Sequence, residues 1–94
     1  MIVVVAIVKL VDGKGDVYVQ EYHRIAPKVR KDPGVITYVL NRHAKNPNQF
    51  LWYEKYENDE ALKYHISTQG YKDFQKNTQQ FVLSATIDKY QEIV

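Results

Sequence analysis

Residues 2–10 read Ile-Val-Val-Val-Ala-Ile-Val-Lys-Leu, an almost unbroken run of apolar, mostly β-branched side chains. A run of this kind, without polar alternation, predicts a β-strand that is buried on both of its faces. It is far shorter than the roughly 20 apolar residues of a membrane span, and it lacks the basic start and the cleavage site of a signal peptide. We therefore expect a strand in a cytoplasmic protein that has no membrane partner.

The next segment has the pattern of an amphipathic helix. After a turn over residues 12–15, apolar side chains recur at helical spacing along one stripe, formed by Tyr18, Tyr22, Ile25 and Val29. Pro27 lacks a backbone N–H group and crowds the preceding turn of a helix. We therefore expect a kink or a break in this helix before Arg30.

The rest of the chain predicts a hairpin, two helices and a final strand. Two β-branched and aromatic segments flank a polar turn at 46–48 and form the hairpin. Asn58 or Asp59 is a suitable N-cap for the helix that follows. The expected elements are strand 2–10, the helix with the stripe from Tyr18 to Val29, strands 35–40 and 49–56, helices 59–66 and 71–82, and strand 82–90.

This order of elements matches the split βαβ pattern of an α+β ferredoxin-like sandwich. In that fold a four-stranded antiparallel sheet carries its helices on one face. Because strand 2–10 is apolar on both sides, the second face of the sheet also needs a cover, and a second copy of the same sheet is the simplest one. The 94 residues thus predict one domain, 1–94, that forms a homodimer.

Composition limits the chemistry that the chain can carry. Thirteen Lys and Arg against eleven Asp and Glu leave a net charge of +2, too small and too scattered for a nucleic-acid partner. The absence of cysteine excludes a disulfide framework and a thiolate nucleophile. The three histidines lack the spacing of a metal site, and Gly13-x-Gly15 lacks the context of a nucleotide loop. We expect no metal and no cofactor.

One strand and one helix supply the candidate catalytic residues. Strand alternation places Phe50, Trp52, Glu54 and Tyr56 on one face. If this face lies under the helix at 59–66, Glu54 can approach His65, and a carboxylate that orients an imidazole makes a general base near neutral pH. The same pair is equally compatible with two buried polar groups that merely satisfy each other.

Eight tyrosines indicate either a pocket for a flat aromatic ligand or the packing of the core and of an interface, because tyrosine combines apolar area with one polar group. With Glu54 and His65 as the catalytic pair, the expected substrate-binding walls are Tyr38, Trp52, Tyr56, Tyr71 and Phe74.

Several short motifs, taken in order, resemble those of one family. They are Asp12-Gly13-Lys14, Asp32-Pro33-Gly34 with Tyr38, Asn46-Pro47-Asn48 with Phe50, Glu54, and Asp59-Glu60-Ala61-Leu62 followed by His65. The chain resembles the antibiotic biosynthesis monooxygenase family over nearly its whole length. This resemblance implies a dimeric α+β barrel. It also implies a cofactor-free monooxygenase or quinol oxidase, in which a phenol or quinol is deprotonated between sheet and helices and reacts directly with oxygen.

One branch of this family degrades haem with an Asn in the first strand, a Trp just before the second helix and a His in the third helix. Here the first strand has no Asn, Tyr56 stands in place of that Trp, and residues 71–82 contain no His, so the haem activity is not implied. Phenol-oxidising relatives often show Glu-x-Trp, whereas this chain reads Glu54-Lys55-Tyr56, and Trp52 lies earlier. A second function stays open, that of a non-catalytic dimeric module that binds a small molecule or regulates.

Overall fold

In the computed structural model, which describes residues 1–94, the apolar run at the N-terminus forms the inner strand β1 (Ile2–Leu10). On its two sides lie β3 (Gln49–Tyr56) and β4 (Val82–Gln91), and β2 (Val35–Arg42) lies beyond β3. All three pairings are antiparallel. The strand order β2-β3-β1-β4 is that of the predicted ferredoxin-like sheet.

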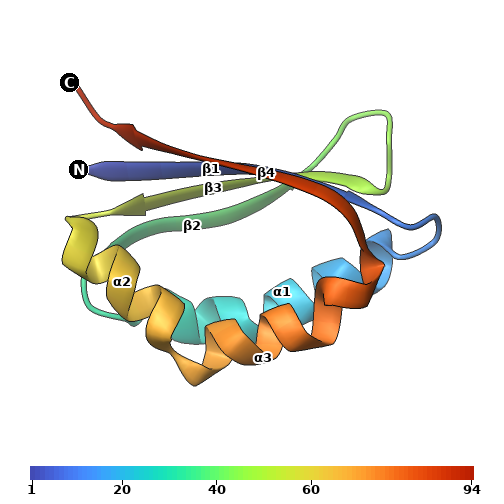
Figure 1. Ribbon diagram of the computed structural model, residues 1–94, viewed down its shortest axis with the longest axis horizontal. Coiled ribbons are helices and arrows are strands. Elements are labelled where there is room, and N and C mark those ends of the chain that lie inside the picture. The colour runs from blue at the N-terminus through green and yellow to red at the C-terminus, as the bar shows by residue number, and fades with distance from the viewer.

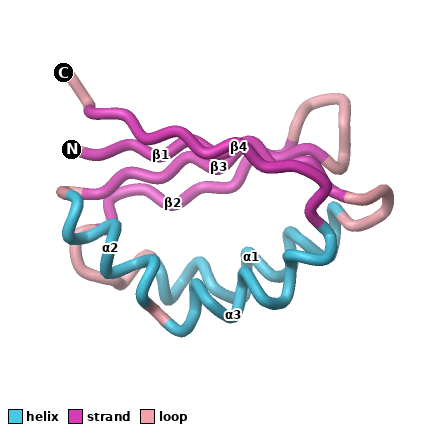
Figure 2. Tube along the Cα trace, viewed as in Figure 1, coloured by secondary structure: helices cyan, strands magenta, loops and turns pink.

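Three helices cover one face of this sheet and leave the other face bare (Figure 1). They are α1 (Gly15–Val29), α2 (Asp59–Ser67) and α3 (Gln69–Thr78), and a single 3₁₀ turn at Gln79–Phe81 leads from α3 into β4. Figure 2 shows the same two layers, helices below and strands above. None of the helices is long and apolar enough to cross a membrane. The predicted α+β class is confirmed.

Two helix ends differ in how well the sequence predicted them. The helix α1 continues through Pro27 without a break and ends at Val29, so the break expected from Pro27 does not occur, although the helix does end before Arg30. The helix α3 ends at Thr78 and not at Val82, because the chain tightens into the 3₁₀ turn before it joins the sheet. Phe81 and Val82 continue the apolar stripe of the sequence, but Phe81 lies in the 3₁₀ turn and Val82 begins β4.

The core lies between the helices and the facing side of the sheet. The stripe of α1 is buried there, and so are alternate residues of β1 and β3. Along β3, Phe50 and Trp52 are buried whereas Leu51 and Tyr53 are exposed, so the predicted strand alternation is confirmed. Burial of a side chain the size of Phe50 contributes about 1.5–3 kcal/mol to stability.

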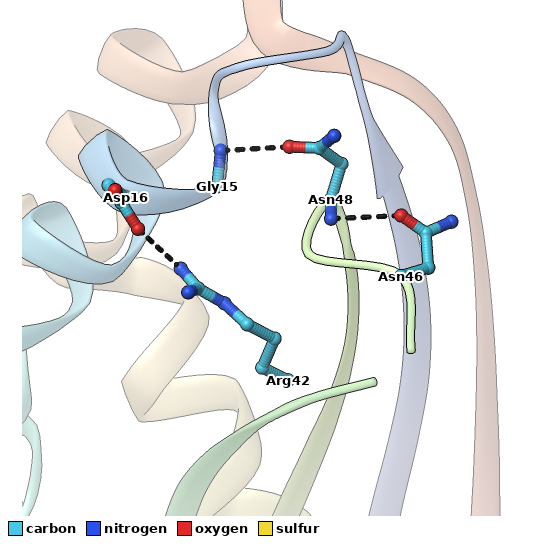
Figure 3. Close-up of polar contacts among 5 residues, drawn as sticks. All are labelled: Gly15, Asp16, Arg42, Asn46 and Asn48. Atoms are coloured by element: carbon cyan, nitrogen blue, oxygen red, sulfur yellow. Dashed lines mark hydrogen bonds and ion pairs between the residues drawn. The ribbon is translucent and has the colours of Figure 1, made fainter. Parts of the chain in front are cut away.

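The turn between β2 and β3 holds the start of α1 in place (Figure 3). The helix has no side-chain cap of its own, and Asn48 Oδ1 instead accepts a hydrogen bond from the Gly15 N–H at 3.3 Å. Asn46 Oδ1 in turn accepts from the Asn48 N–H at 3.0 Å, and Arg42 donates to Asp16 Oδ1 at 3.0 Å. A Cβ atom at position 15 would lie only 2.3 Å from the carbonyl oxygen of Pro47, which explains why glycine begins this helix.

Candidate functional site

A cavity of about 530 Å³ opens between the helix-facing side of the sheet and the helices α2 and α3. Nineteen residues line it and thirteen of them are hydrophobic, so a few polar groups stand in a largely apolar wall. This size and this lining are typical of sites for small organic ligands. A second hollow, of about 520 Å³, lies between α1 and β2. Only the first contains the candidate residues Glu54 and His65, and we take it as the candidate site.

The strand register places the polar side chains of the sheet in one row across this cavity. Tyr38 of β2 is paired with Glu54 of β3, Glu54 with Val4 of β1, and Val4 with Lys89 of β4. Residues directly opposite one another in antiparallel strands share a face of the sheet. Glu54 and Lys89 therefore lie in the same row, two strand spacings or roughly 10 Å apart between their backbones. The adjacent row is apolar and consists of Leu40, Trp52, Ala6 and Ile87.

Glu54 is the carboxylate of the cavity. Its Oε1 accepts a hydrogen bond of 2.5 Å from the hydroxyl of Tyr56, two residues further along the same strand face. Burial raises the pKa of Glu54 above its ordinary value, and the hydrogen bond from Tyr56 acts in the opposite direction. A carboxylate with a raised pKa is suited to take a proton from a substrate near neutral pH.

His65 reaches the cavity from α2. Asn58 caps this helix through a 2.9 Å hydrogen bond from the Ala61 N–H to its Oδ1, which fixes the face that α2 turns inward. His65 is only 2% exposed, and its Nδ1 has no hydrogen-bond partner. Its ring centroid lies 5.2–5.7 Å from those of Tyr38, Tyr56 and Tyr71. Burial lowers the pKa of His65 to about 4, so the imidazole is neutral at pH 7.

The sequence predicts a direct contact between Glu54 and His65, and this prediction is wrong. Both residues line the cavity, but Glu54 accepts its hydrogen bond from Tyr56 and His65 Nδ1 has no partner. The physical reason is proximity, because the residue at i+2 on a strand face lies closer than a side chain from the opposite layer. A carboxylate that fixes the imidazole tautomer is therefore not part of this site.

Four of the five predicted wall residues line the cavity: Tyr38, Trp52, Tyr71 and Phe74. Tyr56 does not, because it is completely buried behind Glu54, and its assignment to the wall is corrected. Burial of Tyr38 and Tyr71 raises the pKa of each phenol above its ordinary value, so both remain protonated at pH 7.

Five polar residues of the cavity were not among the candidate site residues of the sequence: Tyr18, Gln75, Thr78, Gln79 and Lys89. Tyr18 belongs to the buried stripe of α1 and also accepts a 2.9 Å hydrogen bond from the indole Nε1 of Trp52. Alternation along β4 could have found Lys89, because it shares a strand face with Ala85 and Ile87, which also line the cavity.

Comparison with known proteins identifies the family. The family model for antibiotic biosynthesis monooxygenase matches residues 1–77. The chain therefore belongs to the antibiotic biosynthesis monooxygenase family.

Solved structures share the fold. A protein of Nitrosomonas europaea, assigned by its name to the antibiotic biosynthesis monooxygenases, superimposes with a TM-score of 0.95 at 16% identity, with 100% of both chains covered. One from Caulobacter crescentus CB15, named in the same way, gives 0.92 at 24% identity over 99% of this chain and 90% of its own. A conserved protein from Methanosarcina mazei Go1 gives 0.91 at 19% identity over 98% and 92%. No curated protein matches the sequence.

Proposed function

We propose that this chain is a cofactor-independent monooxygenase or quinol oxidase that acts on a small phenolic or quinol substrate with molecular oxygen. Membership of the antibiotic biosynthesis monooxygenase family supports a monooxygenase-like role. The observation that carries the finer proposal is a carboxylate, Glu54, with a raised pKa in a cavity otherwise lined largely by apolar and aromatic side chains.

The reaction begins when a substrate hydroxyl loses its proton to Glu54. Oxygen attacks a phenolate far more readily than a phenol, so a base beside a dry aromatic wall lowers the barrier, and general-base catalysis contributes roughly 10²–10⁴-fold in rate. Trp52 and Phe74 hold the substrate ring. His65 is neutral at pH 7, and in this proposal it supplies a hydrogen bond to a substrate oxygen and does not itself carry the charge.

The substrate supplies all of the electrons. In the oxidase reaction a quinol gives two electrons and two protons to oxygen, and the products are a quinone and hydrogen peroxide. In the monooxygenase reaction the quinol gives four electrons. One oxygen atom then forms a new C–O bond on the ring and the other leaves as water, so the products are a hydroxyquinone and water.

A homodimer completes the proposal. The face of the sheet that the helices leave bare carries an apolar patch on β1 and β3, where Ile7, Leu51 and Tyr53 are each more than a third exposed beside the half-buried Val3 and Val5. Lys9 and Lys55 lie at the two ends of this patch. Contiguous apolar area of this kind marks a protein–protein interface. A second copy with the same face is the natural partner, since most oligomers are symmetric homo-oligomers.

Oxygen consumption tests the proposal. The purified chain is mixed with a panel of quinols in chelator-treated buffer, and oxygen uptake is followed with an electrode while products are identified by mass. We expect at least one quinol to consume oxygen above autoxidation at a rate proportional to protein concentration. If quinols bind in the cavity and none is consumed above autoxidation, the chain is the non-catalytic binding module and the proposal is wrong.

A further inference from the structure

We infer that Lys89 selects the substrate, and that the substrate carries an anionic oxygen group, a carboxylate, on the side of its ring opposite the hydroxyl that faces Glu54. This inference rests on the proposed function, because it concerns the same cavity. It adds the chemical class of the substrate and a residue that recognises it.

The charges in the cavity are sparse and ordered. Among its lining residues, Glu54 and Lys89 are the only acidic and basic side chains apart from His65, which is neutral at pH 7. They stand in one row of the sheet with only Val4 between them. An aromatic ring that lies on Val4 therefore has the carboxylate of Glu54 at one end and the ammonium group of Lys89 at the other.

The present partner of Lys89 is easily replaced. Its Nζ lies 2.9 Å from Oδ1 of Asp59, and the two side chains are 55% and 50% exposed. An ion pair this open to water contributes little free energy, so a ligand carboxylate can replace Asp59 when the ring that carries it also packs against the largely apolar cavity wall. Asp59 tolerates the exchange, because it lies in the first turn of α2, where the helix dipole favours a negative charge.

A purely structural role for the Lys89–Asp59 pair makes a different prediction. If the pair only ties β4 to α2, loss of either partner has the same effect on ligand binding. If Lys89 recognises an anion, the two losses have opposite effects, because Asp59 competes with the ligand for the ammonium group.

Calorimetric titration under argon separates the two roles, since without oxygen no turnover occurs. The ligands are 3,4-dihydroxybenzoate, whose carboxylate lies opposite a hydroxyl, and its methyl ester. The variants are Lys89→Met, Lys89→Arg and Asp59→Asn. Lys45→Met is the control, because it removes one positive charge from the loop between β2 and β3, which does not line the cavity.

We expect Lys89→Met to weaken binding of the acid about tenfold and to leave the ester within about twofold, as for the loss of one charge-assisted contact. Lys89→Arg retains the preference of the native protein, Asp59→Asn strengthens binding of the acid, and Lys45→Met changes neither ligand. Equal effects of Lys89→Met on acid and ester overturn the inference, and so does failure of the native protein to bind the acid.

The outcome is separable from that of the proposed function. Selective binding of the acid through Lys89, with no oxygen uptake for any quinol, supports the recognition of a phenolic acid and contradicts the oxidase. Oxygen uptake with neutral quinols, with no difference between native protein and Lys89→Met in binding the acid, supports the oxidase and contradicts the role of Lys89.

Discussion

At the scale of single residues, burial shifts the two titratable groups at the centre of the cavity toward their neutral forms. It raises the pKa of Glu54 and lowers the pKa of His65 to about 4. The hydrogen bond from Tyr56 is the interaction that favours the ionised form of Glu54. In the proposed reaction Tyr56 therefore favours the ionised base from behind the carboxylate, although it does not line the cavity.

Replacement of Tyr56 by Phe tests this positioning role. Without its donor, the pKa of Glu54 rises further, and the fraction of ionised base at a given acidic pH falls. We expect the acidic limb of the pH profile of kcat/KM for oxygen uptake to move to higher pH, with the rate on the alkaline plateau changed less. Tyr64→Phe, at an exposed position outside the cavity lining, is the control. An unchanged acidic limb in Tyr56→Phe contradicts the role.

His65 predicts a pH dependence of stability. Its pKa is about 4 in the folded protein and 6.5 in the unfolded chain, so between these values the unfolded state binds more protons. The contribution is present in full above pH 6.5 and is lost as the pH falls toward 4. From pH 7 to pH 5 it amounts to about 1–2 kcal/mol of unfolding free energy.

Urea unfolding at pH 7 and pH 5 measures this loss in the native protein and in His65→Gln, which removes the titrating group. Glu54 acts with the opposite sign, since the pKa of a buried carboxylate is raised and stability falls as the pH rises through it. Both proteins retain Glu54, so its effect cancels when the loss of unfolding free energy in His65→Gln is subtracted from the loss in the native protein. The same loss in both would show that His65 does not titrate as its burial requires.

At the scale of elements, the sequence predicted what depends on local pattern and missed what depends on register. The alternation of buried and exposed residues in β3 gave the correct face of Trp52 and Glu54, because period-2 alternation belongs to a single strand. The row that joins Glu54 to Lys89 depends on how β1 pairs with both neighbours, and no single segment encodes that pairing. The hydrogen bond of Glu54 likewise depends on side-chain placement in the folded core.

Two glycines provide a matched test of how the β2–β3 turn supports α1. Gly15→Ala forces a Cβ atom to within 2.3 Å of the Pro47 carbonyl oxygen, and we expect it to lower the free energy of unfolding by about 1–3 kcal/mol. Gly70→Ala is the control, because position 70 lies in α3 with open space around it and an ordinary backbone conformation. We expect it to be neutral or to stabilise by up to about 1 kcal/mol. Equal effects of the two substitutions on the free energy of unfolding, measured by chemical denaturation, would contradict this support of α1 by the turn.

At the scale of the whole molecule, one face of the sheet packs against the helices and the other face carries no helix (Figure 1). The doubly apolar sequence of β1 predicts this division, since Val4 and Ala6 pack under the helices and Val5 and Ile7 turn to the bare side. The fold class and the position of the cavity wall follow from such patterns. The volume of the cavity does not, because it depends on how the aromatic rings pack against one another.

Val5→Lys tests the proposed dimer. A lysine on the bare face places a charge in an interface that we propose to be dry, so we expect the dimer to dissociate. Light scattering coupled to size exclusion at micromolar concentration measures the mass, and circular dichroism checks that the monomer is folded. Asn77→Lys, an equal change of charge on the exposed side of α3, leaves the dimer intact. A native protein that is already a monomer at this concentration contradicts the account.

The central claim is that Glu54 takes the proton that makes the substrate reactive toward oxygen. The most direct measurement is kcat/KM for oxygen uptake by the native protein and by Glu54→Gln, with the best quinol of the panel and with thermal unfolding of both proteins as a check on folding. The amide of the variant can still accept the hydrogen bond from Tyr56 but cannot accept a proton, and we expect kcat/KM to fall by roughly 10²–10⁴-fold at pH 7. A folded Glu54→Gln variant that oxidises quinols as fast as the native protein would contradict the account.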